Sequence, residues 1–524
     1  MWLFLWRRKQ VFLLTVCLGL SLYAIFLWSP SLATRYWHWP WLREQHLDFL
    51  PSWLHLLLSY LFASVASSVE ISQGTVVGTV LIDSTLPRPI EAFLGIPYAQ
   101  PPTGERRFKR PQPVKPSSDI IHASKYGKRK LPVAIYVHGG AFNSGSGLHD
   151  QILLFKWVQE NIGAFGGDPN QVTLIGLSAG AHSIGHHVMH NSGQQLFSRA
   201  VLESGATTSR AVYPPDNPLH EKQFREFLAE ARCSNLPENE IITCLQSKPM
   251  YDIARASESI FNHYNPSDRW AFQPVIDGEI IKDAPIKNWK SGKWNKVPIL
   301  TGFNTHEGAP FVPSDMEKSE EFTDFFRALI PPLPASDTKI LNHLYPDPLK
   351  HPESPYVDGR DIDVGAQYKR ATAAYGQFAY ICPVRQTAQL ASEAQDAPVY
   401  LYHWALNKTV KGGASHGDQS EYEVYSPYVR RLSDAQEKIA GYIHAYFTSF
   451  ITNGDPNKIQ GKYADRPRWT PFKAKASKSV MVLGEGNDER AGGGHVGIAA
   501  QMADNKWSEK ECEFWSDRSI LTES

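Results

Sequence analysis

The chain has 524 residues with 53 basic and 53 acidic side chains, so it is formally neutral. That balance excludes the strongly basic surface of a nucleic-acid-binding protein. With 42% hydrophobic and 12% aromatic residues, the chain can bury a large core. Its length alone suggests about three domains, but α/β enzymes of this size often form a single domain.

The first 66 residues contain two apolar segments. Residues 11–28 carry no charge and follow Arg7-Arg8-Lys9, which is typical of a signal anchor with a cytoplasmic N-terminus. Residues 49–66 are also apolar and end in Ser64-Val65-Ala66, which resembles a signal-peptidase site. Two complete spans would return the chain to the cytoplasm. We expect instead that residues 67–524 form one domain that is lumenal or extracellular, either secreted or anchored through this segment.

Cysteine usage supports an oxidising compartment. Cys17 lies in the first apolar segment, which leaves an even set of four: Cys233, Cys244, Cys382 and Cys512. Four cysteines permit three pairings, and free buried thiols are the alternative. We therefore expect disulfides in this domain, with the pairing left open by the spacing.

The chain then alternates strand and helix patterns. We expect a hairpin within 71–81, a Pro/Gly-rich loop at 93–104, a strand at 132–138, a helix at 150–161 and a loop at 163–170. Another strand follows, from Val172. The order strand, helix, strand predicts a parallel pair with a right-handed crossover.

The strand from Val172 ends in Gly176-Leu177-Ser178-Ala179-Gly180. In a Gly-x-Ser-x-Gly turn between a strand and a helix, small neighbours allow a tight bend that lifts the serine hydroxyl above the sheet edge. A serine in that place suits nucleophilic acyl transfer. The sequence His138-Gly139-Gly140-Ala141-Phe142 also follows a strand, and small residues there let backbone N–H groups turn into a shared cavity. A plain glycine turn is the alternative.

Three histidines recur every four residues after this turn, at His182, His186 and His190, with His187 beside them. Helical spacing would stack them on one face, which raises the question of zinc. No glutamate completes an H-E-x-x-H site. We therefore interpret them as buried or half-buried histidines and expect no metal.

Downstream strands are expected at 200–205, 272–278, 297–303 and 399–404, with helices within 216–250 and 433–452. The loops that follow 297–303 and 399–404 carry Glu307 and His416, where a rigid sheet can aim an acid and a base. Spacing alone leaves three competitors for these roles, namely Asp277, Asp418 and His306.

Several motifs together resemble those of the type-B carboxylesterase/lipase family, the cholinesterase-like branch of the α/β-hydrolases, and in particular those of its fungal members. They are FLGIPYAQPPTG (93–104), HGGAF (138–142), FGGDP (165–169), GLSAGA (176–181), PVIDG (274–278), GFNTHEG (302–308) and HGD (416–418). The resemblance extends from about residue 70 to the C-terminus. It implies an α/β-hydrolase fold with a mostly parallel central sheet and helices on both faces.

The resemblance also implies the site. Ser178 would be the nucleophile, Glu307 the acid and His416 the base, without a metal or organic cofactor. The backbone N–H groups of Gly140, Ala141 and Ala179 would form the oxyanion hole. Family-like disulfides would join Cys233 to Cys244 and Cys382 to Cys512.

The chain departs from the family pattern at two places. A segment with a strand is missing before the strand at 132–138, near residue 127, and a second strand is missing between Phe142 and His149. The second strand would lie beside the strand at 132–138, which is therefore expected to expose an unpaired edge of an incomplete sheet. We favour the loss of two coding segments from the gene model over a natural deletion variant.

These patterns predict a serine hydrolase that cleaves a small-molecule or lipid carboxylic ester through an acyl-enzyme. The alternative is a catalytically impaired or non-catalytic interaction protein of the cholinesterase-like type. Leu177 stands where many family members carry glutamate, and the segment with the choline-binding tryptophan is missing, so a neutral ester is expected. Asn407-Lys408-Thr409 is a glycosylation sequon that fits a secretory route.

Overall fold

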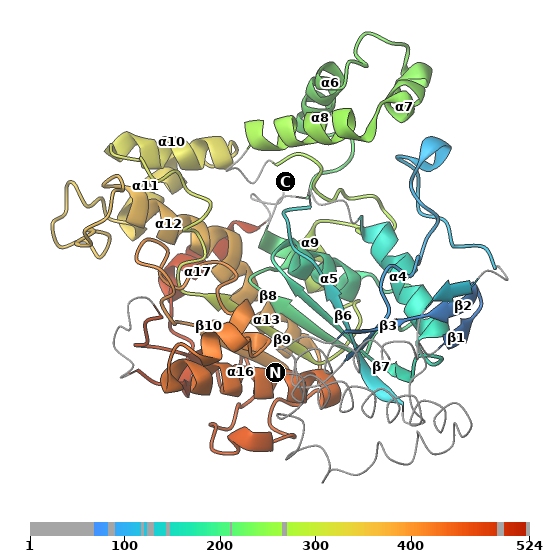
Figure 1. Cartoon of the computed structure of the whole chain (residues 1–524). Helices are drawn as coiled ribbons and strands as arrows, with labels where there is room; N and C mark the ends of the chain where they lie inside the picture. Colours follow the sequence, from blue (N-terminus) through green and yellow to red (C-terminus); the bar gives the residue numbers. More distant parts are fainter. Residues whose placement is uncertain are drawn as a thin grey trace, which may run out of the picture. The chain divides into compact units, whose positions relative to one another are not determined.

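A sheet of seven strands forms the centre of the fold (Figure 1), in the order β12-β11-β10-β9-β8-β7-β6. All its strands are parallel except β12, which pairs antiparallel with β11. The mostly parallel α/β fold is thus confirmed. The strands are β6 (Leu131–Val137), β7 (Gly167–Leu177), β8 (Arg199–Glu203), β9 (Ile299–Asn304), β10 (Val399–Trp404), β11 (Ser479–Leu483) and β12 (Ala500–Asp504).

This computed structural model describes residues 68–81, 90–116, 120–122, 130–142, 147–209, 212–264, 270–489 and 497–519. All of them lie within one unit, Ser68–Ser524. The signal anchor and signal peptide predicted in the first 66 residues fall outside the described residues. Within the described part, no helix is long and apolar enough to cross a membrane.

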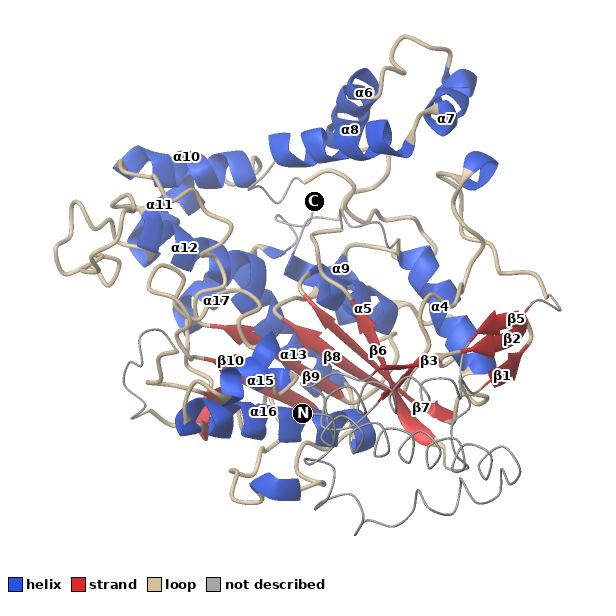
Figure 2. Cartoon of the chain, viewed as in Figure 1, coloured by secondary structure: helices blue, strands red, loops and turns tan. Residues whose placement is uncertain are grey.

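Helices cover both faces of the sheet (Figure 2). Along β10, Val399 and Leu401 pack in one hydrophobic cluster, while Tyr400 and Tyr402 pack in the other. The first cluster includes side chains of α4 (Leu148–Asn161), α5 (Ala179–Met189) and α13 (Cys382–Ala394), and the second includes α16 (Asp434–Asn453). Because both faces are covered, every residue of β8, β9 and β10 is buried, as expected for parallel strands.

Strand β6 differs from these central strands. Ile135 and Val137 are buried, but Ala134 is exposed and Tyr136 is 61% exposed. Among the described residues, β7 is the only strand paired with β6. The sheet therefore ends at the strand for which the sequence predicts an unpaired edge.

The N-terminal strands form two small sheets. β1 (Ser68–Ile71) and β2 (Gly74–Val77) make an antiparallel hairpin, and β5 (Ile120–His122) pairs parallel with β2. The hairpin expected within 71–81 thus begins earlier, because β3 (Thr79–Leu81) leaves it and pairs with β4 (Ile90–Ala92).

Two other expectations need correction. β7 begins at Gly167, inside the predicted loop 163–170, because Leu131 of β6 already pairs there. No strand forms at 272–278. Instead, Oδ1 of Asp277 accepts hydrogen bonds from the backbone N–H groups of residues 279, 280 and 281, which closes a turn.

The remaining helices lie mostly in the long connections between strands. They are η2 (Gly104–Arg106), η3 (Thr207–Ser209), α6 (Pro218–Glu230), α7 (Glu238–Ser247), α8 (Met250–His263), α9 (Pro285–Ser291), α10 (Ser319–Leu329), α11 (Ala335–Leu344), α12 (Tyr368–Gly376), the π-helical η4 (Gln377–Ile381), α14 (Ser420–Glu423), α15 (Pro427–Arg430), η5 (Gly461–Tyr463) and α17 (Glu509–Asp517). Helices α6 and α8 share a small core of their own, against which Ala141 and Phe311 pack.

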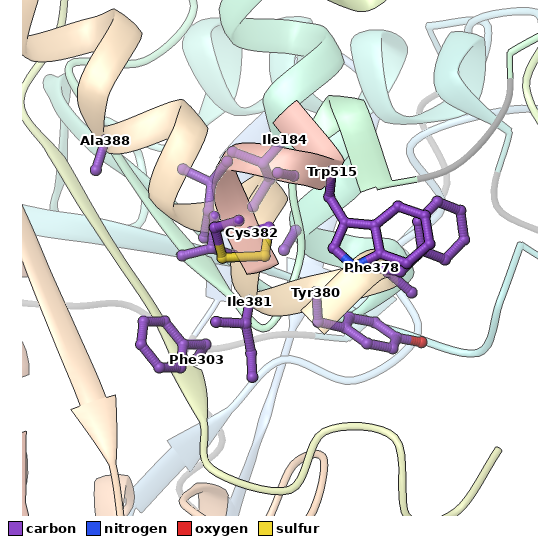
Figure 3. Close-up of a cluster of buried hydrophobic side chains, with 14 of the residues drawn as sticks. Ile184, Phe303, Phe378, Tyr380, Ile381, Cys382, Ala388 and Trp515 are labelled. Atoms are coloured by element: carbon purple, nitrogen blue, oxygen red, sulfur yellow. A yellow bond between two sulfur atoms is a disulfide. The ribbon is translucent and has the colours of Figure 1, made fainter. Parts of the chain in front are cut away.

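Two disulfides join the pairs implied by the resemblance. Cys233 bonds to Cys244 across 11 residues, and Cys382 bonds to Cys512 across 130 residues. The second lies in the main hydrophobic cluster beside Phe378 and Trp515 (Figure 3). It ties α17 to α13 and so anchors the C-terminal part of the chain to the sheet.

Removal of the two disulfides should destabilise the protein unequally. In the loop-entropy model, a closed loop of 130 residues stabilises by about 5 kcal/mol and one of 11 residues by about 3 kcal/mol. The double variant Cys382→Ala/Cys512→Ala should therefore lose more free energy of unfolding than Cys233→Ala/Cys244→Ala. Urea unfolding of both variants checks this, and an equal or reversed loss would contradict it.

Candidate active site

Ser178 occupies a strained turn between β7 and α5, with φ 58° and ψ −125°. The flanking glycines make this turn sterically feasible. A Cβ at Gly180 would lie 2.0 Å from the carbonyl oxygen of Val137, and one at Gly176 would lie 2.6 Å from the carbonyl carbon of Gly180. Strand β7, helix α5 and the end of β6 therefore pack together only because both positions lack a side chain. Strained backbone of this kind is concentrated at functional sites.

The loop after β6 passes directly beside Ser178. A Cβ on Gly139 would lie 3.3 Å from the Cβ of Ser178, and Gly140 and Ala141 both adopt positive φ angles, 109° and 52°. Nε2 of Gln273 donates a hydrogen bond of 3.0 Å to the carbonyl oxygen of Ala141. Of the three predicted oxyanion residues, Gly140 and Ala141 directly follow Gly139 on this loop, and Ala179 is the first residue of α5.

Glu307 and His416 form a buried pair at the ends of neighbouring strands. Oε2 of Glu307 lies 2.6 Å from Nδ1 of His416, and the two side chains are 0% and 10% exposed. Oε1 of Glu307 accepts a hydrogen bond of 2.6 Å from the backbone N–H of Asn304. Both carboxylate oxygens are therefore engaged, which fixes the carboxylate of Glu307 and, through it, the orientation of the imidazole of His416.

The opposite nitrogen of His416, Nε2, is buried and has no hydrogen-bond partner among the described residues. The loop that carries it touches the serine turn, because a Cβ on Gly417 would lie 3.3 Å from Cδ2 of Leu177. The histidine and Ser178 thus sit on two loops whose adjoining residues are in contact. Catalytic hydrogen bonds often tighten only when substrate binds.

Two aromatic rings border the histidine. The ring of Tyr380 is centred 4.5 Å from that of His416, and the ring of Phe311 lies 5.1 Å away in an edge-on arrangement. Tyr380 belongs to η4, a π-helical segment, and such segments are frequent at functional sites. These rings make the surroundings of the His416 imidazole apolar.

The three competing residues have other partners. Asp277 closes the turn described above. Oδ2 of Asp418 accepts from the backbone N–H of Ser415 at 2.7 Å, and burial raises the pKa of Asp418 to about 6. Nδ1 of His306 accepts from the backbone N–H of Ala414 at 3.1 Å. The structure thus brings Glu307 to His416 and uses these residues to shape the surrounding loops.

The histidines of α5 are held by protein groups. Nδ1 of His182 lies 2.6 Å from the carbonyl oxygen of Ala206, and Nε2 of His187 lies 2.8 Å from Oε1 of Gln151. Burial lowers the pKa of His186 to about 4 and that of His187 to about 3, so both are neutral near pH 7. No group of three metal-binding side chains occurs among the described residues.

Sequence reasoning missed several polar residues that support the site: Gln273, Asn304 and Gln419. Asn304 precedes Glu307 by three residues within the GFNTHEG motif, and Gln419 directly follows the HGD motif at 416–418. Buried amides in such loops need hydrogen-bond partners, and this need was the available signal. No comparable signal in the sequence pointed to the aromatic neighbours of His416, Phe311 and Tyr380.

A mostly parallel sheet that presents a serine on a strained strand-to-helix turn, with a buried acid–histidine pair at nearby strand ends, defines an α/β-hydrolase. Residues 65–129 and 146–515 match the carboxylesterase family. The chain belongs to this family and is a carboxylic ester hydrolase. The unmatched residues, 130–145, contain β6 and the His-Gly-Gly loop, and they lie between the two places where the sequence departs from the family pattern.

Individual relatives agree with this placement. Secreted lipase 4 of Gibberella zeae is 31% identical over 501 positions, which cover 80% of this chain and 88% of the lipase. Acetylcholinesterase of Danio rerio is 27% identical over 571 positions, covering 81% and 87%. Each alignment has more positions than the number of residues that this chain contributes to it. The relatives therefore carry residues within the aligned region that this chain lacks.

The fold also resembles a solved structure. EstA of Aspergillus niger superposes with a TM-score of 0.70 at 21% identity, covering 88% of this chain and 99% of EstA. At this level of identity the likeness supports the fold alone.

Loosening the His-Gly-Gly loop should slow ester hydrolysis. Gln273→Leu removes the hydrogen bond to the Ala141 carbonyl, and we expect kcat to fall about 10-fold, less than the loss of an oxyanion donor itself. Steady-state kinetics on p-nitrophenyl butyrate measure this. Gln389→Leu, the same change at an exposed position of α13, is the control and should match wild type. Equal kcat values for the two variants would contradict the role of Gln273.

Proposed function

We propose that the protein hydrolyses carboxylic esters through a covalent acyl-enzyme formed on Ser178. His416 acts as general base and Glu307 as its acidic partner. The observation that carries this proposal is the buried hydrogen bond between Glu307 and Nδ1 of His416, which leaves Nε2 without a partner on the loop that contacts the serine turn. That arrangement matches the geometric logic of a Ser-His-acid triad.

The reaction follows from these positions. Nε2 of His416 accepts the hydroxyl proton as Oγ of Ser178 attacks the ester carbonyl carbon. Glu307 keeps the proton of the imidazole on Nδ1 and stabilises the positive charge that develops on the ring. The imidazolium then donates its proton to the departing alcohol, and the acyl group stays on the serine. Water, activated by the same histidine, releases the acid.

Negative charge develops on the carbonyl oxygen during both steps. We assign its stabilisation to the backbone N–H groups of Gly140, Ala141 and Ala179. The close approach of Gly139 to Ser178 and the hydrogen bond from Gln273 support this assignment. Each such donor typically contributes about 10²- to 10³-fold in rate.

We infer a neutral ester as substrate. Leu177 precedes the nucleophile, so no anion adjoins the serine on that side, and the rings of Phe311 and Tyr380 give the site an apolar wall. The relatives include a lipase and an acetylcholinesterase, so Leu177 and the apolar wall, rather than the relatives, carry the preference for a small-molecule or lipid ester over a cationic choline ester.

We also propose an extracellular location. Two disulfides suit an oxidising compartment, and the lipase relative is a secreted protein. The sequon asparagine, Asn407, is partly buried in the loop after β10, with its backbone N–H donating to the carbonyl oxygen of Asn487. Its glycosylation remains a prediction of the sequon.

The exposed edge at β6 favours one competing function, a chain of esterase origin that lacks activity. Tyr136 is largely exposed there, and β6 leads directly into the loop beside Ser178. A shift of this loop by about 1 Å would already cost about 10²-fold in rate. Labelling of the serine separates an active site from an inactive one.

Ser178 should react with a fluorophosphonate probe and should be required for turnover. Because only this residue supplies the nucleophile, Ser178→Ala should abolish both labelling and hydrolysis of p-nitrophenyl butyrate. Mass spectrometry of the labelled peptide identifies the modified residue. Ser204→Ala, at a buried serine after β8, controls for labelling elsewhere. Hydrolysis by the Ser178→Ala variant at the wild-type rate would refute the proposal.

Glu307→Gln should impair catalysis without removing the side chain. The amide would present an N–H toward Nδ1 and hold the imidazole in the wrong tautomer, so we expect kcat to fall by up to about 10⁴-fold. The rate of p-nitrophenyl butyrate hydrolysis measures this loss, and circular dichroism confirms the fold. A kcat within about 10-fold of wild type would exclude Glu307 as the acid.

A further inference from the structure

Two further glutamates lie beneath the site and take no direct part in the mechanism above. Glu203 is the last residue of β8, 1% exposed, and its carbonyl oxygen accepts a hydrogen bond of 2.9 Å from the N–H of Ser178. Glu423 is the last residue of α14, and its Oε1 atom is buried. The two carboxyl groups lie within hydrogen-bonding reach of each other.

This contact requires a proton. Ionised carboxylates only accept hydrogen bonds, so two of them can bond to each other only if one is protonated. No protein donor serves Oε1 of Glu423 among the described residues. Burial raises the pKa of Glu203, and burial together with the adjacent charge of Glu203 raises the pKa of Glu423 well above its usual range.

The groups that face the pair reinforce this state. Tyr402 of β10, which is buried, and Tyr136 of β6, whose side chain is largely exposed but partly desolvated, both have raised pKa values; desolvation is the first cause and the negative charges of the two glutamates follow. Glu307 adds a third acidic group near Tyr402. The described groups that interact with the pair are thus acidic or neutral, and none supplies a positive charge that would favour two ionised carboxylates.

A chain of hydrogen bonds leads from the pair to the triad. Nε2 of Gln419 donates to Oε2 of Glu203 at 3.1 Å, and Oε1 of Gln419 accepts from Nδ2 of Asn304 at 2.8 Å. Nδ2 of Asn304 also donates to the carbonyl oxygen of Ser415, at 2.5 Å, and the backbone N–H of Asn304 donates to Glu307. Gln419 and Asn304 are both 0% exposed.

The glutamate pair determines the donor and acceptor order along these hydrogen bonds. Because Glu203 accepts, the amide of Gln419 must turn its nitrogen toward the pair and its oxygen toward Asn304. Asn304 is then committed as a donor to the residue before His416. A single negative charge on the pair keeps Glu203 a strong acceptor. Two charges would repel each other, and a pair with no charge would make a weaker hydrogen bond to Gln419.

We propose that Glu203 and Glu423 share one proton and that this pair, through Gln419 and Asn304, holds Glu307 and His416 in position for catalysis. Both glutamates are positioning residues, since neither touches the reacting atoms. The inference rests on the proposed function of Ser178, Glu307 and His416.

Full-length variants at Glu423 test this. Glu423→Leu leaves Glu203 without its partner, and we expect kcat for p-nitrophenyl butyrate to fall about 10- to 100-fold with KM within about 3-fold of wild type. Glu423→Gln offers an amide N–H to Glu203 without a shared proton and should restore most of kcat. Glu421→Gln, the same change at the outer face of α14, is the control and should match wild type.

Infrared difference spectra test the proton itself. At pH 7, wild type and Glu421→Gln should both show a protonated-carboxyl C=O stretch that Glu423→Gln lacks. An unchanged spectrum in Glu423→Gln, or a wild-type kcat in Glu423→Leu, would overturn the inference. Should Glu423→Leu not fold, Glu423→Gln and the spectra still decide. Failure of wild type to label at Ser178 would instead overturn the proposed function, because the carboxyl stretch does not depend on the serine.

Discussion

The tight turn at Ser178 is the constraint on which the site depends. The close packing of β7, α5 and the end of β6 is allowed only by glycines, since a side chain at Gly180 would collide with the Val137 carbonyl. Once these elements are in contact, the His-Gly-Gly loop has to pass beside the serine. A single packing arrangement thus brings together Ser178, our proposed nucleophile, and the loop to which we assign charge stabilisation, whereas the proposed acid and base follow strands further along the sheet.

Glu307 and His416 are positioned by a different kind of contact. Glu307 is buried with both oxygens bonded, and each bond leads to another buried polar group. A buried carboxylate is costly unless it is fully paired, so removing one member leaves its neighbours unsatisfied. The buried polar groups around Glu307 are therefore linked by hydrogen bonds, and the amides of Asn304 and Gln419 belong to that network as much as the acids do.

The sequence predicted the features that rest on local chemistry. Glycine spacing pointed to Ser178. Strand ends offered Glu307 and His416 beside three competitors, and the family resemblance chose between them; the structure contains the buried bond between these two residues. The prediction of a strand at 272–278 was wrong. This short apolar segment has no neighbouring strand to pair with in the described structure, and Asp277 closes it into a turn. The antiparallel β11–β12 pair, the partners of Gln419 and the aromatic surround of His416 depend on contacts between distant segments, which no local pattern encodes.

The disulfide between Cys382 and Cys512 has a consequence for the integrity of the molecule. It encloses β10, the His416 loop and α16 within a single covalent loop. A proteolytic cut anywhere inside that loop would leave both fragments attached, and His416 would remain covalently connected, through the uncut side of the loop, to the sheet that carries Ser178. In an extracellular medium rich in proteases, a nicked chain would migrate as one species until it was reduced, and it would keep the pieces of its site together.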